Sequence, residues 1–207
     1  KKSTVVYLLL SLCLSGIFTF CFFSARMQRE WDNTLYPNVI RLHVVASDND
    51  KVSQELKYAV KDRVVDYVAA LTRYCRNETE AEHVLTEHLC DIDAFAKAQS
   101  VKLGGDGKVK TSFGEEYYTV RTFCNMTFPG GKYKSLRIML GEAKGKNWWC
   151  VLYPNLCDAV ATDEAETRLK NAGVSDDSAE AVCRSKDYAV CFYFLELLEN
   201  LTDSAKS

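Results

Sequence analysis

The sequence lacks the marks of several common protein classes. Its 26 basic and 28 acidic residues give a net charge of -2 at pH 7, so no basic excess is available for binding nucleic acid. No internal repeat or low-complexity segment is visible, and hydrophobic residues make up 47% of the 207 residues. These values predict an ordinary folded domain and exclude nucleic acid as the expected partner.

Familiar catalytic and cofactor-binding motifs are also missing. His83 and His88 are five positions apart, which is not the i, i+4 spacing of a zinc-binding helix, and His43 suits ordinary strand packing. Gly104–Lys108 and Gly141–Asn147 lack the spacing of a phosphate-binding loop, so we interpret both as turns. No Gly-x-Ser-x-Gly sequence is present, and no cysteine stands beside an evident base that would make it a nucleophile. We therefore expect no enzyme, no metal, no cofactor and no small-molecule substrate.

The first part of the chain is uncharged and mostly apolar from Val5 to Phe23. As a helix this stretch would span about 28 Å, close to the roughly 30 Å of bilayer hydrocarbon. The candidate cleavage sites near its end are poor, so within residues 1–25 we favour a retained membrane anchor over a cleaved signal peptide, and both alternatives stay open. Residues 26–37 are expected to be a polar tether. No later segment can span a membrane, so we predict an extracytoplasmic domain over residues 38–202.

Nine cysteines are many for a chain of this length, and the number is odd. Cys150 and Cys157 are predicted to form a disulfide, because such a short ring stabilises the fold by about 2.5 kcal/mol in the loop-entropy relation. Cys183 and Cys191 are taken to lie on one helix, where they would be about 12 Å apart and unable to pair. The cysteines interpreted as small buried hydrophobic residues are Cys75, Cys90, Cys124, Cys183 and Cys191.

Hydrophobic periodicity predicts one strand and two long helices in the first half of the domain. Ile40–Ala46 suits a strand. Helical spacing from Val52 to Leu71 predicts an amphipathic helix, with Lys57 and Lys61 outside its apolar stripe. A second such helix begins at a capping box at Asn77 and ends before the glycine-rich turn at 104–107.

The second half of the chain is mainly strand-like. A hairpin bend is expected at Pro129–Gly131, and residues 162–170 favour a short helix. Residues 187–195 fit a strand or a helix equally well. The predicted fold class is α+β, with two amphipathic helices packed on a mostly antiparallel sheet after an N-terminal membrane or signal helix. The predicted strands are Lys108–Phe113, Glu116–Phe123, Lys132–Leu140 and Trp148–Tyr153.

The segment Gly141–Cys157 is the most informative part of the sequence. It places Trp148 and Trp149 side by side, directly before the predicted disulfide. Neighbouring residues of a strand point to opposite faces, so one indole can enter the core while the other must find another surface. Two interpretations stay open: both rings are mostly buried, or one is exposed as the anchor of an interface.

This segment closely resembles the signature of the stage II sporulation protein R family of endospore-forming bacteria. Phe128–Tyr133, Leu136-Arg137 and Ile40–Ala46 fit the same family, and the resemblance covers residues 38–158. Three features depart from the family pattern: Ala143 replaces a glycine, Asn155 stands where proline is usual, and the polar run Ser47–Asp50 is rearranged.

The resemblance implies a signalling protein that is exported from the forespore into the intermembrane space between forespore and mother cell. There it would activate a membrane-embedded aspartic protease, which removes the pro-sequence of sporulation sigma factor E. The alternatives are an extracytoplasmic cell-wall hydrolase and a passive envelope-binding protein. The expected docking surface, braced by the Cys150–Cys157 disulfide, consists of Trp148, Trp149, Glu142, Lys144, Lys146, Asn147, Tyr153 and Pro154.

Overall fold

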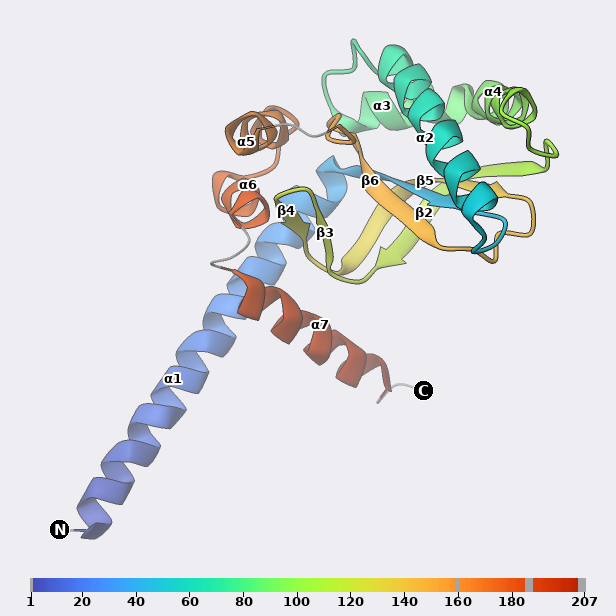
Figure 1. The fold of residues 1–207 in the computed structure, drawn as a ribbon. Coiled ribbons are helices and arrows are strands. Elements are labelled where there is room, and N and C mark those ends of the chain that lie inside the picture. Colours follow the sequence, from blue (N-terminus) through green and yellow to red (C-terminus); the bar gives the residue numbers. More distant parts are fainter. Residues whose placement is uncertain (1, 159–160, 185–187, 205–207) are drawn as a thin grey trace.

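The computed structural model describes residues 2–158, 161–184 and 188–204 (Figure 1). Lys1 and residue 187, which belong to the predicted N-terminal segment and to the undecided 187–195 stretch, lie outside the described residues. The helical elements are α1 (Lys2–Glu30), the π-helical η1 (Trp31–Leu35), the 3-10 turn η2 (Tyr36–Asn38), α2 (Lys51–Leu71), α3 (Glu78–Glu87), α4 (Leu89–Lys102), α5 (Thr162–Asn171), α6 (Asp176–Cys183) and α7 (Ala189–Ser204). The strands are β1 (Ile40–Val45), β2 (Val109–Tyr118), β3 (Arg121–Phe123), β4 (Met126–Phe128), β5 (Gly131–Leu140) and β6 (Asn147–Tyr153).

The main sheet is mixed and has the strand order β2-β5-β1-β6. β1 runs parallel to β5, whereas the β2–β5 and β1–β6 pairs are antiparallel. A separate hairpin is formed by β3 and β4. The α+β fold class is confirmed, and β6 lies at one end of the strand order.

The sheet is covered on both faces (Figure 1). Helices α2, α3 and α4 pack on one face, against a core that includes Leu42, Val44 and Ile138. The other face carries the β3–β4 hairpin, the end of α1 with η1, and the C-terminal helices, around a core that includes Tyr133 and Phe192. Because both faces of the sheet are covered, β1 is buried almost throughout its length, including Arg41.

Two capping side chains start the helices of the first face. Asp50 accepts a hydrogen bond from the Ser53 backbone N–H at 2.6 Å, and Asn77 accepts one from Glu80 N–H at 2.8 Å. The helix predicted from Asn77 onward is interrupted at His88, so it forms α3 and α4 rather than one rod.

The apolar stripe predicted for α2 is wrong at two positions. Val52 is 74% exposed although it was placed inside the stripe. Lys57 is fully buried although it was placed outside it. For Lys57 the reason is a long-range contact: the segment that precedes β6 folds over the first turns of α2 and covers the flank that carries this lysine.

The stretch 26–37, expected to be a polar tether, is helical and joins the core. α1 continues to Glu30, and Met27, Trp31 and Leu35 are each at most 5% exposed. These three residues are spaced i, i+4, i+8, so they share one helix face. The residues between them are mostly polar, and for this reason the average composition of the stretch does not reveal that face. One helix in the described residues, within Thr4–Asn38, is long and apolar enough to cross a membrane.

The middle strands differ in their bounds from the prediction. β2 is continuous across the expected break at 113–116, and its partner is β5. The inserted β3–β4 hairpin turns at Cys124, whose φ of 53° lies in the left-handed region. Pro129–Gly131 therefore links β4 to β5 and does not form the hairpin itself.

The C-terminal part is helical. The predicted short helix is confirmed as α5, and residues 189–195 of the undecided stretch belong to α7. Cys183 and Cys191 lie on different helices, α6 and α7, so the single-helix argument against their pairing was wrong, although both thiols are free. Burial is confirmed for these two, whereas Cys75 is only partly buried and Cys90 and Cys124 are exposed.

Candidate functional site

The predicted disulfide between Cys150 and Cys157 is present. It ties β6 to the turn that follows, and the Leu156 backbone N–H donates to the Val151 carbonyl at 3.0 Å within the same ring. Both cysteines are buried among residues of the α2–α4 side. The end of β6 is therefore held by a covalent bond in addition to its pairing with β1.

The two tryptophans point to opposite faces of β6, as strand geometry requires. Trp149 packs on the side of the C-terminal helices and Trp148 on the side of α2–α4. Both rings are half-buried and neither is exposed. The structure thus divides the pair between two cores and gives neither ring a free face of its own.

Each indole is held by an aromatic ring and by a cation. Trp149 stacks on His43 at a centroid distance of 5.6 Å, and the Arg121 guanidinium lies 4.2 Å from its ring centre. Trp148 meets Phe123 edge-on at 5.6 Å, and the Lys61 ammonium lies 4.5 Å from its ring centre. Such cation–π contacts contribute on the order of 1 kcal/mol each.

The loop before β6, residues 141–147, is pinned against the β1–α2 connection by its backbone. Lys144 N–H donates to Ser47 O at 2.9 Å, and Gly145 N–H donates to Ala46 O at 3.0 Å. A β-carbon at Gly145 would collide with the Asp48 backbone, so only glycine allows this approach. The loop is rigid in its backbone and exposes its longer side chains, which belong to Glu142, Lys144, Lys146 and Asn147.

A buried lysine fastens the same loop to α2. The Lys57 ammonium donates to the Lys146 carbonyl at 3.1 Å and to Gln54 Oε1 at 2.8 Å. Burial lowers the pKa of Lys57, and the nearby positive charge of Lys146 lowers it further. Lys57 thus fastens the loop before β6 to α2, and Gln54 in turn donates to the Asp48 carbonyl of the β1–α2 connection at 2.7 Å.

A polar cluster lies on the sheet beneath Trp149. His43 Nδ1 is 2.8 Å from Glu116 Oε1, and the Ser135 hydroxyl donates to Glu116 Oε2 at 3.0 Å. Burial raises the pKa of Glu116, but the hydrogen bonds from His43 and Ser135 outweigh it and the net pKa is lowered. Next to it, the buried Arg41 guanidinium lies 4.2 Å from the Tyr118 ring centre.

This cluster does not have the arrangement of a hydrolase. Ser135 gives its proton to Glu116 and not to His43, so no hydroxyl is paired with an imidazole base. The other imidazole nitrogen, His43 Nε2, is buried and has no hydrogen-bond partner. Among the residues that the structure describes, no group of three or more His, Cys, Asp or Glu side chains could hold a metal ion. The geometry suits a role in orienting the ring of Trp149.

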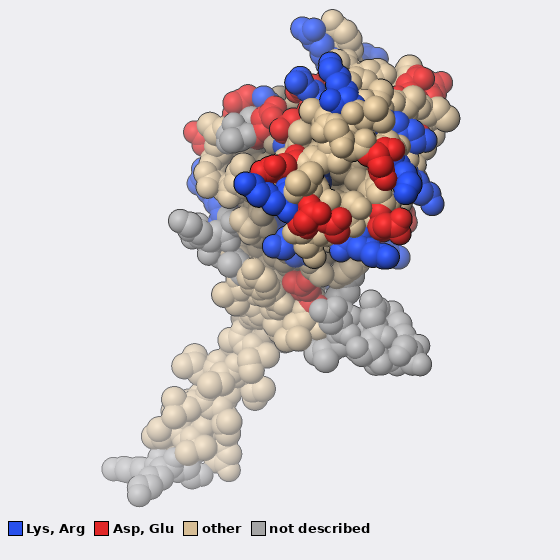
Figure 2. All heavy atoms as spheres, turned by 45° about the vertical axis from the view of Figure 1, so that its right-hand side comes forward, with Lys and Arg blue, Asp and Glu red and all other residues tan. Residues whose placement is uncertain are grey.

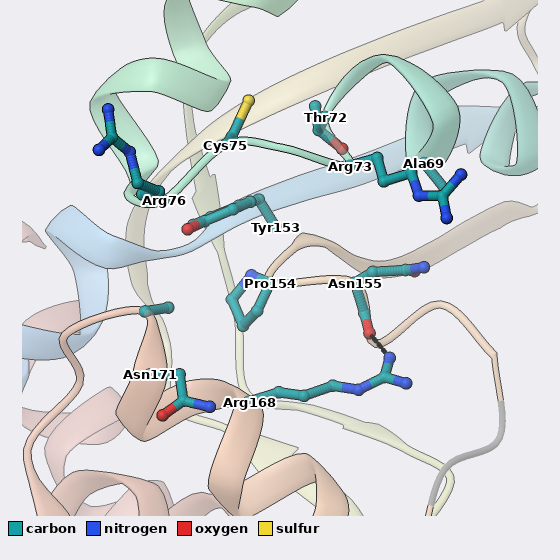
Figure 3. Close-up of a pocket in the computed structure, with 11 residues that line it drawn as sticks. Ala69, Thr72, Arg73, Cys75, Arg76, Tyr153, Pro154, Asn155, Arg168 and Asn171 are labelled. Atoms are coloured by element: carbon teal, nitrogen blue, oxygen red, sulfur yellow. Dashed lines mark hydrogen bonds between the residues drawn. The ribbon is translucent and has the colours of Figure 1, made fainter.

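The remaining two predicted docking residues lie at the opposite end of β6. Tyr153 and Pro154 are buried, and with Asn155 they line a cleft of about 530 Å³ between the end of α2 and α5 (Figure 3). Arg168 of α5 donates to the Asn155 carbonyl, as the dashed line in Figure 3 shows. Arg73 also lines the cleft. The predicted surface therefore falls into two parts, the 141–149 end and the 153–155 end.

Charged side chains of both signs are mixed over the domain, and no large field of one sign covers the face drawn in Figure 2. Exposed pairs such as Glu142 with Lys144, 3.8 Å apart, add to this mixture. A partner that binds the 141–147 loop would thus meet one acidic and two basic side chains and not a large field of one sign.

Three further side chains shape this site: Arg121, which the sequence did not indicate, and Lys57 and Lys61, which were expected outside the apolar stripe of α2 and not at the tryptophans. Arg121 belongs to a hairpin inserted between β2 and β5, and no local pattern relates it to β6. The two lysines follow the α2 stripe by one position each, a spacing that could have suggested partial burial.

Comparison with known proteins gives a consistent picture. The family model described as stage II sporulation protein R matches residues 36–163. A Bacillus subtilis protein named stage II sporulation protein R is 30% identical over 159 residues, which cover 76% of this chain and 71% of that protein. No solved structure matches.

Proposed function

The chain belongs to the stage II sporulation protein R family, and from this premise we propose that it is an exported sporulation signal that activates a membrane-embedded aspartic protease. The protease then removes the pro-sequence of sigma factor E, which couples gene expression in the forespore and the mother cell. The protein acts in the intermembrane space, with α1 as its export signal or membrane anchor. Activation follows if binding favours the active state of the protease over the inactive one.

One observation carries the proposal: the family match spans β1 to β6 and so includes the whole braced segment 141–157. The backbone hydrogen bonds of Lys144 and Gly145 and the Cys150–Cys157 disulfide all hold that segment in place. A surface that is already ordered loses little conformational freedom when a partner binds, so more of the contact energy remains to shift the partner's equilibrium. No specific feature of the described residues favours the hydrolase or the passive binding protein.

We place the contact on the 141–147 loop rather than on the buried faces of the tryptophans. Replacing both Trp148 and Trp149 by alanine would remove packing from two cores at about 3–5 kcal/mol each, so lost activity would only report unfolding. The exposed loop side chains can be removed with little effect on stability, because surface ion pairs contribute about 0–1 kcal/mol.

The experiment co-expresses the full chain, the candidate protease and its pro-sigma substrate in a host that does not sporulate. Cleavage of the pro-sigma factor is followed by immunoblot. Wild-type chain is expected to trigger cleavage only when it is exported. If the exported wild-type chain leaves the substrate uncut, the proposed function is wrong.

A matched pair of variants tests the surface. E142A/K144A/K146A removes one acidic and two basic side chains from the loop, and E180A/R184A/K170A removes the same charges from α5, α6 and the residue that follows α6. The loop variant is expected to lose at least about tenfold in cleavage rate, equal to 1.4 kcal/mol of binding, while the control stays near wild type. Equal activity of the two variants would show that the protease is contacted elsewhere.

A further inference from the structure

Helix α7 carries apolar side chains on two sides, one packed on the domain and the other exposed to solvent. Its inner face carries Phe192, which is buried, and Glu196, which accepts a hydrogen bond from the Val120 backbone N–H at 3.3 Å. Its outer face carries Val190, Tyr193 and Leu197, which are 72%, 61% and 56% exposed. These three residues are spaced i, i+3, i+7, so they form a continuous stripe along one side of the helix.

The position of α7 relative to α1 indicates what covers this stripe. Phe194 meets Phe20 edge-on at a centroid distance of 4.8 Å, and Cys191 Sγ lies 3.7 Å from Ser24 Oγ. α7 therefore touches α1 where the uncharged run ending at Phe23 gives way to polar residues. If α1 lies in a bilayer, this transition lies at the boundary between hydrocarbon and headgroups.

The direction of α7 fits the same boundary. In Figure 1, α7 runs across α1 and away from it instead of continuing alongside. With α1 along the membrane normal, α7 then lies close to the membrane plane. An exposed apolar helix face at this level is held about 5–10 Å into the boundary between headgroups and acyl chains.

We propose that α7 is an interfacial membrane helix, seated on the leaflet from which α1 emerges through Val190, Tyr193 and Leu197. The second attachment fixes the orientation of the domain, since a single helix leaves rotation and tilt free. Residues 189–204 contain no lysine or arginine, so the attraction is apolar and requires no anionic lipid. The inference rests on the part of the proposed function that retains α1 in the membrane.

The test uses photo-crosslinking of the full chain reconstituted in phosphatidylcholine vesicles. Tyr193→p-benzoylphenylalanine places the probe on the stripe, and Tyr74→p-benzoylphenylalanine is the matched control, because Tyr74 is 83% exposed on the loop between α2 and α3. Irradiation followed by mass spectrometry identifies lipid adducts and protein adducts. Lipid adducts are expected from position 193 and not from position 74, with no change when phosphatidylglycerol is added.

Two results would overturn the proposal. Adducts at position 193 with a second copy of the chain would make the stripe a protein interface, and the absence of adducts would leave it in water. The vesicles contain no protease, so this outcome is independent of signalling. Lipid adducts from a chain that fails to trigger pro-sigma cleavage would refute only the proposed function, and cleavage by a chain without lipid adducts would refute only the membrane seat of α7.

Discussion

Opening the Cys150–Cys157 ring measures how far the covalent brace stabilises the domain. The bonded residues are seven positions apart, so the ring contains eight residues counting both cysteines. The loop-entropy relation then gives an entropy loss of about 8 cal/mol/K in the unfolded chain, or about 2.5 kcal/mol of stability at 25 °C. For a domain of this size the same free energy corresponds to a fall of roughly 5–10 °C in Tm.

The assay is denaturant unfolding of the full chain in detergent, followed by tryptophan fluorescence. Reduced wild type keeps both sulfur atoms, so its difference from the oxidised chain isolates ring closure from packing. C150A/C157A adds the loss of two buried sulfur atoms and should unfold at a still lower denaturant concentration. C90A removes an exposed free thiol and is expected to stay within about 0.5 kcal/mol of wild type.

Reduced wild-type protein is expected to unfold at a lower denaturant concentration than oxidised wild-type protein. If oxidised and reduced wild type unfold at the same denaturant concentration, ring closure does not restrict the unfolded chain as calculated. A reduced chain that loses about 2.5 kcal/mol of stability yet triggers the protease normally would show that the brace serves folding and not recognition.

Two further substitutions test the surroundings of β6. The pKa of Glu116 is raised by burial but lowered overall by His43 and Ser135, so its stabilisation is present above the ordinary value of 4.5 and lost as pH falls through the folded pKa. Unfolding measured against pH should therefore show a steeper acid loss in wild type than in E116Q, and identical slopes would contradict the assignment. Ala143 has a φ of 53°, so A143G is expected to raise stability by up to about 1 kcal/mol in thermal unfolding. A161G, at a φ of -61°, should bring no gain, and a loss in A143G would mean that the left-handed backbone is not strained.

Local features of the sequence were sufficient for much of the fold. The capping side chain Asn77, the strand at 40–45 and the helix at 162–171 depend on neighbours within a few positions, and all are present. Ala143 stands where the family pattern has glycine, and its backbone is in the left-handed region. Glycine adopts this conformation without cost, which explains the family pattern at this position.

Features that depend on distant contacts escaped prediction. The stretch 26–37 looked polar by composition, but Trp31 is buried against Phe192, more than a hundred residues later. The pattern of residues 189–195 fits a strand or a helix equally well, and the structure shows a helix whose Cys191 and Phe194 contact Ser24 and Phe20 of α1. Lys57 entered the interior because the 141–147 loop closes over it.

By itself the sequence determined the apolar N-terminal helix, the disulfide, the alternation that sends Trp148 and Trp149 to opposite faces, and the family. Each of these follows from residue types at short separations. Only the tertiary structure decided that a cation lies over each indole, that the predicted docking residues divide between two ends of β6, and that α7 leaves an apolar stripe exposed. These follow from which segments meet in space, and hydrophobic burial is non-directional, so many pairings satisfy one sequence pattern until the whole chain has packed.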